Sequence, residues 1–220
     1  QNPARRAGIK AGLPIEKPAY LINQVCGSGL RSIAAGYQSI ISNDAKIIIA
    51  GGQESMTNAP HTIDFRNNKK LDESKLVDTM IKDGLWDAFN GYHMGVTAEN
   101  VATKFQVTRD DQDKFALNSQ EKALKAQKEN RFKSEIVSVN IKLKDSESVF
   151  NRDEHPREGI EISALKKLKP IFQKNGTVTA GNASGINDGA AALTLMSSTE
   201  AEKRGLEKLA TIKSWASCGV

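Results

Sequence analysis

The pattern of apolar and polar positions is clearest over residues 30–50. Apolar side chains recur every three or four positions over residues 30–41, which predicts an amphipathic helix. The pair Asn43-Asp44 ends this helix. The following run, residues 46–50, is apolar and β-branched at successive positions, which is typical of a strand covered on both faces. The stretch therefore predicts a helix followed by a buried strand.

A turn with a cysteine joins this helix to the segment before it. Residues 19–25 look extended, and Cys26-Gly-Ser-Gly29 forms a turn that can open a helix. Residues 19–51 are therefore predicted to form a β-turn-α-β unit of a layered α/β sheet, with a right-handed crossover.

The character of the chain changes over residues 53–172, where polar and charged segments carry short helical patterns. Thr108 with Asp111 makes a capping box for a helix that runs to about Glu129. Residues 136–143 alternate between apolar and polar, as in a half-buried strand. This region is predicted to be an insertion, a lid or loop domain.

A regular pattern returns near the C-terminal end. Residues 190–196 and 209–215 are predicted strands, and residues 199–204 a short charged helix between them. The predicted fold class is α/β, a layered α-β-α fold with an inserted α+β loop domain.

Composition and charge narrow the function classes. Apolar residues make up 39% and charged residues 26%, a soluble globular balance. The longest apolar run stops at Gly51-Gly52, and the first residues have no apolar signal-peptide core, so we expect a cytoplasmic protein without membrane contact. The net charge of +5 fits a polyanion ligand, but the basic side chains near Glu121 and Glu129 are mixed with acids, which is typical of a solvated helix face. With aromatic residues at only 5%, nucleic acid is not an expected partner.

Cys26 is the first candidate for chemistry. It precedes a predicted helix, where N–H groups and the helix dipole favour a thiolate, and Gly27 and Gly29 let a substrate approach without a Cβ in the way. A buried structural cysteine beside a glycine turn fits the spacing equally well. Cys26 and Cys218 are far apart, and neither C-x-x-C nor H-E-x-x-H occurs, so no metal site is predicted.

Two further segments are candidates for ligand contact. Residues 177–189 are mostly small, so their backbone can lie against a ligand, although they match neither the dinucleotide-binding nor the P-loop pattern. His93, in Gly91-Tyr-His-Met-Gly95, has the most ligand-like setting of the histidines. A tight loop and a structural histidine are the alternatives.

Taken together, these segments resemble the thiolase family over nearly the whole chain. The resemblance rests on a nucleophile motif, a glycine-rich turn after the next strand, a loop-domain signature in two parts and a post-loop signature: Asn23-Gln-Val-Cys-Gly-Ser-Gly-Leu30, Gly51-Gly-Gln-Glu-Ser-Met56, Gly91-Tyr-His-Met-Gly95 with Thr97-Ala-Glu-Asn100, and Gly176-Thr-Val-Thr-Ala-Gly-Asn-Ala-Ser-Gly185. Cys-Gly-Ser-Gly together with His-Met points to the short-chain, acetoacetyl-CoA type.

The resemblance implies an activity and its site. Two acetyl-CoA molecules would condense to acetoacetyl-CoA and CoA, or the reverse, through acetyl-Cys26, with the Cys26 N–H helping to bind the thioester oxygen. Coenzyme A thioesters would be substrates, and no separate cofactor is expected. His93 and Met94 would line the acyl and pantetheine pocket, Arg157 would lie near the nucleotide end and Ser184 near the pantetheine. The full set of implied substrate and CoA contacts is Leu85, His93, Met94, Arg157, Phe172, Ala180 and Ser184.

The resemblance also implies domain boundaries and an oligomer. Some family members have a serine where Ala164 stands, and Ser163 is adjacent. The segment around residues 61–75 resembles the loop through which family members form tetramers, so a homotetramer or dimer is expected. The implied division of the chain is part of the N-terminal half, the loop domain, the return to that half and the start of the C-terminal half: residues 1–57, 58–186, 187–205 and 206–220.

The chain departs from the family in length, and looks like a fragment without the first part of the N-terminal half and most of the C-terminal half. It has no Asn-Glu-Ala-Phe-type motif, no Gly-His-Pro histidine that would activate the nucleophile and no late Cys-x-Gly motif. Cys218 is not assigned to that last role because residues 213–220 look like a strand. We expect this chain alone to be inactive. The alternatives are a ketoacyl-synthase-like condensing enzyme, which the match at residues 91–100 opposes, and a truncated, non-catalytic CoA-binding module.

Overall fold

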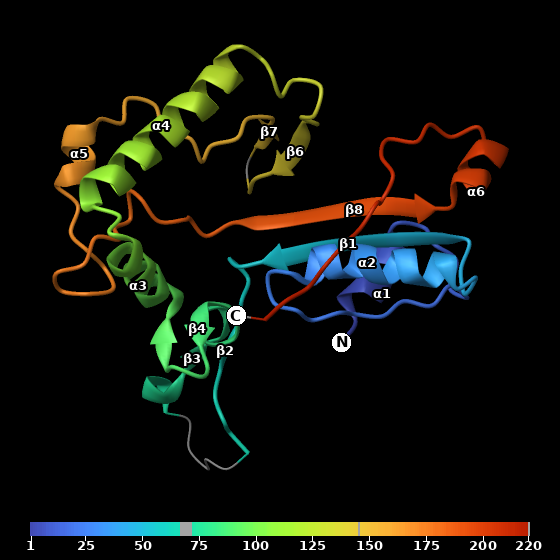
Figure 1. The fold of residues 1–220 in the computed structure, drawn as a ribbon, viewed down its shortest axis with the longest axis horizontal. Coiled ribbons are helices and arrows are strands. Elements are labelled where there is room, and N and C mark those ends of the chain that lie inside the picture. Colours follow the sequence, from blue (N-terminus) through green and yellow to red (C-terminus); the bar gives the residue numbers. More distant parts are fainter. Residues whose placement is uncertain (67–71, 145, 220) are drawn as a thin grey trace. The chain divides into compact units, whose positions relative to one another are not determined.

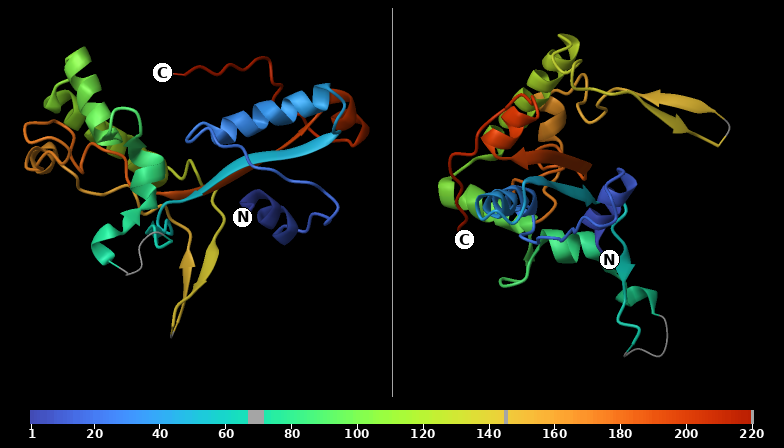
Figure 2. Two further views of the ribbon diagram at one scale, coloured as in Figure 1. Left: turned by 90° about the horizontal axis from the view of Figure 1, so that it is seen from below. Right: turned by 90° about the vertical axis from the view of Figure 1, so that its right-hand side faces the viewer.

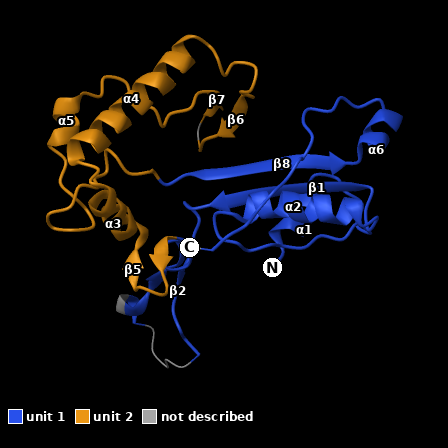
Figure 3. Cartoon of the chain, in the orientation of Figure 1, with its two compact units in different colours: residues 1–84, 186–220 blue, residues 85–185 orange. Residues whose placement is uncertain are grey.

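The chain folds as two compact units (Figure 3). The computed structural model describes residues 1–66, 72–144 and 146–219. Unit 1 comprises residues 1–84 and 186–220, and unit 2 comprises residues 85–185. The predicted loop domain, residues 58–186, begins before residue 85, the first residue of unit 2, and the predicted domain boundaries stay a prediction.

Unit 1 is organised around one long strand pair. Strand β1 (Ile47–Ser55) lies antiparallel to β8 (Asp188–Met196), in a register that runs from Ile47 opposite Met196 to Ser55 opposite Asp188 (Figure 1). The strands predicted at residues 46–50 and 190–196 are thereby confirmed, and both are longer than expected. The right-handed crossover predicted between residues 19–25 and 46–51 is wrong, because residues 19–25 form no strand and the neighbour of β1 is the antiparallel β8.

Helix α2 (Ser28–Ile41) packs on this strand pair and confirms the predicted amphipathic helix. Ala34 and Ala50 are buried, and a Cβ at Gly36 would lie 2.8 Å from Cδ1 of Leu195, so small residues allow the close approach. Helix α1 (Pro3–Lys10) lies on the opposite side of the β1–β8 ribbon (Figure 2).

Two predicted strands did not form. Residues 19–25 hold no more than an isolated bridge between Gln24 and Cys26, and residues 206–219 are irregular. The strand expected around Cys218, at residues 213–220, is likewise absent from the described residues up to position 219. Strands need a partner for their backbone groups, and in the described residues the β1–β8 sheet has no third strand. An extended apolar pattern without a neighbour therefore stays a coil.

The glycines predicted to make a turn after the strand lie inside β1 instead. A Cβ at Gly51 would overlap the carbonyl oxygen of Ala191 on β8, and a Cβ at Gly52 would lie 3.2 Å from the Cα of Gly29 on α2. Glycine here permits close packing of backbones rather than a turn.

Unit 2 is mainly helical. Its helices are α3 (Met94–Phe105), α4 (Arg109–Lys128) and α5 (Ile162–Lys166). Thr108 and Asp111 form the predicted capping box of α4, and Glu129 is its C-cap. The basic side chains near the end of α4 are exposed, as predicted for a solvated face. The described residues contain no helix long and apolar enough to cross a bilayer.

The remaining elements are short. Antiparallel pairs join β2 to β3, β4 to β5 and β6 to β7, and the predicted strand at residues 136–143 is the shorter β6. Their bounds, with those of the remaining helices, are β2 (His61–Thr62), β3 (Val77–Asp78), β4 (Trp86–Asp87), β5 (Tyr92–His93), β6 (Val139–Lys142), β7 (Glu147–Phe150), η1 (Glu73–Lys75), η2 (Met80–Leu85) and α6 (Ser198–Lys203), the last being the short helix predicted at residues 199–204.

Candidate active site

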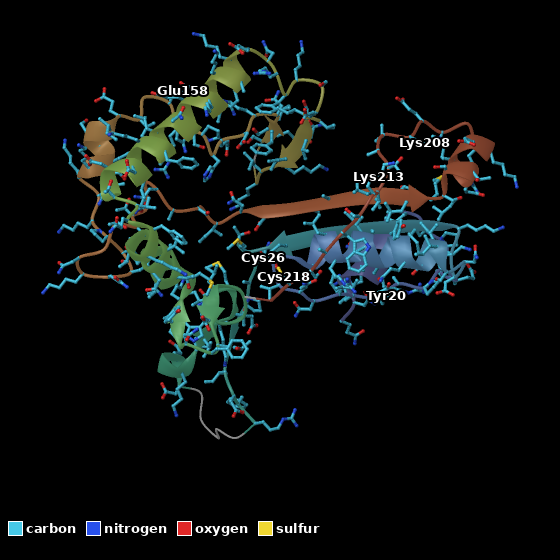
Figure 4. All side chains as sticks on the ribbon, in the orientation of Figure 1. Tyr20, Cys26, Glu158, Lys208, Lys213 and Cys218 are labelled. Carbon is cyan, nitrogen blue, oxygen red and sulfur yellow. The ribbon has the colours of Figure 1, made fainter. Side chains whose placement is uncertain are left out.

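Cys26 lies on a strained turn at the start of α2, and its side chain is exposed (Figure 4). Val25, the residue before it, has φ of 49°, in the left-handed region. A β-branched side chain is a rare outlier there, and such backbone persists only where neighbouring contacts hold it. The sulfur is therefore presented by a bent backbone and is exposed rather than buried.

Ser28 holds this turn from within the first turn of α2. Its hydroxyl donates to the carbonyl of Val25 at 2.6 Å and accepts from the N–H of Gln24 at 2.9 Å. The side-chain oxygen of Asn23 accepts from the N–H of Val25 at 2.9 Å. Three side-chain hydrogen bonds thus fix the backbone on the N-terminal side of Cys26.

The start of α2 can support negative charge next to the sulfur. Gly27 occupies the N-cap position and has no side chain to cap the helix. The N–H of Ser28 donates to the carbonyl of Val25 at 3.2 Å, so within the described residues the N–H groups of Gly29 and Leu30 are the ones left without a partner. Free N–H groups at a helix N-terminus attract anions, including a thiolate or the oxyanion of an acyl-transfer step. The predicted role of Cys26 as a nucleophile is consistent with this geometry.

A groove of about 500 Å³ lies beside this turn within unit 1. Gln24 and Gly27, on either side of Cys26, line it together with Ile212 and residues 214–218. The guanidinium of Arg31 lies over the ring of Trp215, 4.9 Å from the ring centroid, and ties the C-terminal segment to α2. Cys218 also lines the groove, and is exposed.

In unit 2, His93 and Phe172 are brought into contact. Their rings stack with centroids 4.8 Å apart and planes at 20°. Gly95 makes the space, because a Cβ there would overlap the ring of Phe172. The structure therefore joins two of the residues for which the sequence predicted CoA contacts.

His93 is also the N-cap of α3. Its Nδ1 accepts from the N–H of Gly95 at 2.9 Å. Because an N–H donor points at Nδ1, that nitrogen carries the lone pair and the proton of the neutral ring is on Nε2. Nε2 is then the nitrogen that can donate to a ligand.

Residues 177–178 are fastened by Glu99 of α3, whose side chain is buried. Its carboxylate accepts from the N–H of Thr177 at 2.8 and 2.9 Å, from the Thr177 hydroxyl at 2.9 Å and from the N–H of Val178 at 2.8 Å. Burial raises the pKa of this carboxyl, but the hydrogen bonds from Val178 and Thr177 outweigh it and hold the pKa below its ordinary value of 4.5.

A second buried carboxylate, Asp113 of α4, reaches the same segment. Arg109 Nε donates to it at 2.8 Å, and Asn182 Nδ2 donates to its other oxygen at 3.0 Å. The sequence reasoning missed Glu99, Arg109, Asp113 and Asn182. The available signal was a carboxylate among apolar helical positions: Glu99 lies three positions before the buried Ala102 in α3, a helix that the sequence analysis did not predict.

In the part of the chain that the structure describes, the other side chains predicted to contact CoA make no hydrogen bond or ring contact with the stacked rings of His93 and Phe172. Leu85 is half-buried, Met94 is 37% exposed, and Ala180 and Ser184 are exposed on the segment that Glu99 fastens. Arg157 is exposed, and its N–H donates to Gln120 Oε1 at 2.9 Å.

Two minor predictions also have a place in the structure. Ala164 lies in α5, and the neighbouring Ser163 hydroxyl donates to Glu161 Oε2 at 3.2 Å. Of the predicted tetramer segment, residues 67–71 lie outside the described residues. Among the described residues, no group of His, Cys, Asp and Glu side chains could hold a metal ion.

Comparison with known proteins places the chain in a family of acyl-transferring enzymes. The family description "Thiolase, N-terminal domain" matches residues 1–199, so the chain belongs to the thiolase family. It is 57% identical over 220 residues to the acetyl-CoA acetyltransferase of Rhizobium meliloti and 56% identical to that of Paracoccus denitrificans, covering 100% of this chain and 56% of each relative.

Solved structures agree. The acetyl-CoA acetyltransferases of Bacillus anthracis and Syntrophomonas wolfei superpose with TM-scores of 0.85 and 0.87, at 39% and 41% identity, over 94% of this chain and 52% of theirs. The fold is thus a mixed α/β part of the thiolase fold. The chain spans about half the length of the relatives it matches.

Proposed function

We propose that the whole protein transfers acyl groups between coenzyme A thioesters, condensing two acetyl-CoA molecules to acetoacetyl-CoA and CoA and running the reverse thiolysis. The observation that carries the proposal is the exposed Cys26 on a strained turn at an uncapped helix N-terminus. Close similarity to acetyl-CoA acetyltransferases supports the choice of substrate.

The first half-reaction forms the acyl-enzyme. The Cys26 thiolate attacks the thioester carbonyl of acetyl-CoA, the bond from that carbon to the CoA sulfur breaks, and CoA leaves and takes up a proton. The N–H groups at the start of α2 are the donors available for the oxyanion that forms in between.

The second half-reaction makes the carbon–carbon bond. The α-carbon of a second acetyl-CoA loses a proton, attacks the carbonyl of acetyl-Cys26, and the bond to the Cys26 sulfur breaks. Family resemblance gives the activation of the nucleophile to a Gly-His-Pro histidine and the movement of the substrate proton to a Cys-x-Gly cysteine, and residues 1–220 contain neither motif, so acetylation of Cys26 in this chain would depend on the start of α2 alone. We therefore expect the chain alone to accept acetyl groups without turning over.

Unit 2 would supply the coenzyme A contacts. His93 offers Nε2–H as a donor, and the stacked ring of Phe172 gives an apolar surface beside it. Ala180 and Ser184 are exposed residues of the segment that Glu99 holds at Thr177 and Val178. Backbone groups that are accessible there would suit a pantetheine arm, which needs hydrogen-bond partners. Met94, Leu85 and Arg157 complete the predicted set.

The proposal extends to the setting of the whole protein. A cytoplasmic homotetramer or dimer with a complete α-β-α layered fold is expected, and the position of α1 and α2 on opposite sides of β1–β8 supports the layering (Figure 2). Among the described residues, the exposed basic face of α4 carries the Lys125–Glu129 ion pair, which supports a solvated surface rather than a nucleic-acid site.

Acetylation of the chain tests the proposal. Incubation of the 220-residue chain with acetyl-CoA, followed by peptide mass analysis, should give an acetyl adduct on the peptide with Cys26, in the wild type and in Cys218→Ala but not in Cys26→Ala. Bound CoA with no adduct would instead support the non-catalytic module. Acylation only from an acyl carrier protein would support the ketoacyl-synthase alternative.

A further inference from the structure

The segment with Ala180 and Ser184 has a buried side and an exposed side. Val178 and Thr179 are buried, whereas Ala180 and Ser184 are exposed. A Cβ at Gly181 would lie 2.6 Å from side-chain carbons of two leucines in and after α5, Leu165 and Leu168, so this glycine faces inward. The shape of the buried side therefore decides how the exposed side is presented.

A single amide shapes the buried side. Asn182 Oδ1 accepts from the N–H of Thr179 at 2.7 Å, and Nδ2 donates to the carbonyl of Thr177 at 3.1 Å. The same Nδ2 donates to Asp113 at 3.0 Å. The amide of Asn182 thus closes residues 177–182 into a loop and joins that loop to α4.

Asp113 adds to the backbone contacts of Thr177 and Thr179 in determining which way this amide points. A carboxylate only accepts hydrogen bonds, so it selects Nδ2 as its neighbour and turns Oδ1 toward Thr179. The Asp113 side chain is 0% exposed, and Arg109 Nε pairs with its second oxygen at 2.8 Å. Nη2 of Arg109 also donates to the carbonyls of Leu165 at 2.7 Å and Leu168 at 3.0 Å, which fixes the guanidinium.

We propose that Asn182, oriented by Asp113, is a positioning residue that holds residues 177–184 in the shape that binds coenzyme A. The inference rests on the proposed function, because it assumes that Ala180 and Ser184 contact CoA. It adds a cause for that contact: a buried ion pair on α4 sets the orientation of one amide, and this amide sets the backbone that the ligand meets.

The charge change Asn182→Asp provides a sharp test. It places a second carboxylate beside Asp113, and like charges at such distance raise the pKa of the pair until one of them is protonated. The other charged groups near this pair are already engaged. Arg109 of α4 faces Asp113, and Glu99 of α3 is hydrogen-bonded to Thr177 of the same loop. Lys166 of α5 pairs with Asp110 at 3.5 Å. Protonation of one carboxyl restores a donor between positions 113 and 182.

The expected readout is an affinity that depends on pH. Calorimetric titration of the 220-residue chain with CoA should show N182D binding on the order of 10-fold more weakly than wild type at about pH 8, with most of the loss recovered at about pH 5.5. Asn182→Ala, which removes the bonds without adding charge, should bind weakly at both values. Asn118→Asp, the same change on an exposed position of α4, should match wild type.

Amide hydrogen exchange gives a second measurement that does not need the ligand. Exchange of the Thr179 N–H should be slow in wild type, fast in N182A, and fast in N182D only at the higher pH. Wild-type affinity for CoA in N182D, or a loss of equal size at both pH values, would overturn the positioning role. A wild-type chain that binds no CoA would overturn the proposed function and, with it, the part of this network in CoA binding.

Discussion

Both carboxylate oxygens of Glu99 accept hydrogen bonds from the backbone N–H of Thr177, and one of them also accepts from the Thr177 hydroxyl. Although these residues are far apart in sequence, they form the tightest link between α3 and the segment proposed to bind coenzyme A. A Cβ at Gly176 would overlap this carboxylate, so the glycine before Thr177 is part of the same arrangement.

The Glu99 link should make the stability of unit 2 depend on pH. Because the pKa of Glu99 is lowered in the folded chain, its contribution is fully present above about pH 4.5 and is lost as the pH falls through the lowered pKa. Glu99→Gln has only one acceptor oxygen for these donors and should cost about 1–3 kcal/mol near neutral pH. Urea unfolding by circular dichroism should show that cost, with a weaker acid dependence than wild type; equal acid sensitivity of both proteins would contradict it.

Ser28→Ala should loosen the turn that presents Cys26. The hydroxyl makes hydrogen bonds to Val25 and Gln24, and its loss should cost about 1 kcal/mol and slow the acetylation of Cys26 by acetyl-CoA. The rate is measured by quenched peptide mass analysis. Ser39→Ala is the matched control, because its hydroxyl bonds only the carbonyl of Ala35 within the same helix, and a slowing of equal size there would argue against a special role for Ser28.

Gly95→Ala should separate His93 from Phe172. The added methyl group overlaps the Phe172 ring, and overpacking of this kind typically costs about 1–3 kcal/mol. CoA affinity, measured by calorimetry, should fall together with the stability of unit 2. A Cβ at Gly189 meets nothing within 4 Å, so Gly189→Ala serves as the control for stability and should leave the free energy of unfolding unchanged.

Arg109→Lys should weaken unit 2 although it keeps the charge. A lysine cannot reproduce the planar fork that bonds Asp113 and the carbonyls of Leu165 and Leu168 at once. With Asp113 fully buried, we expect a loss of about 1–3 kcal/mol in the free energy of unfolding. Arg131→Lys, at an exposed position, should be neutral, and a neutral R109K would show that charge alone suffices.

The sequence patterns predicted the elements that depend on residues close together in the chain. Helix α2 follows from its apolar spacing and α4 from the capping box at Thr108, and Cys26 lies at a helix start as its glycine turn predicted. The predicted strands at residues 19–25 and 209–215 failed because a strand depends on a partner that its own sequence does not contain. The hydrogen bonds from Thr177 to Glu99 and from Asn182 to Asp113 were missed for the same reason, because these partners lie 78 and 69 positions apart.

The contact between Gly29 and Gly52 has a mechanical consequence. Helix α2 approaches β1 closely there: a Cβ at Gly52 would lie 3.2 Å from the Cα of Gly29, so a side chain at position 52 would shift the helix slightly, whereas a Cβ at Gly29 would make an ordinary contact 3.7 Å from the Cα of Gly52. Since Cys26 is carried at the end of that helix, the displacement would reach the sulfur directly. The glycine at position 52 of β1 thereby helps to set the position of the Cys26 sulfur.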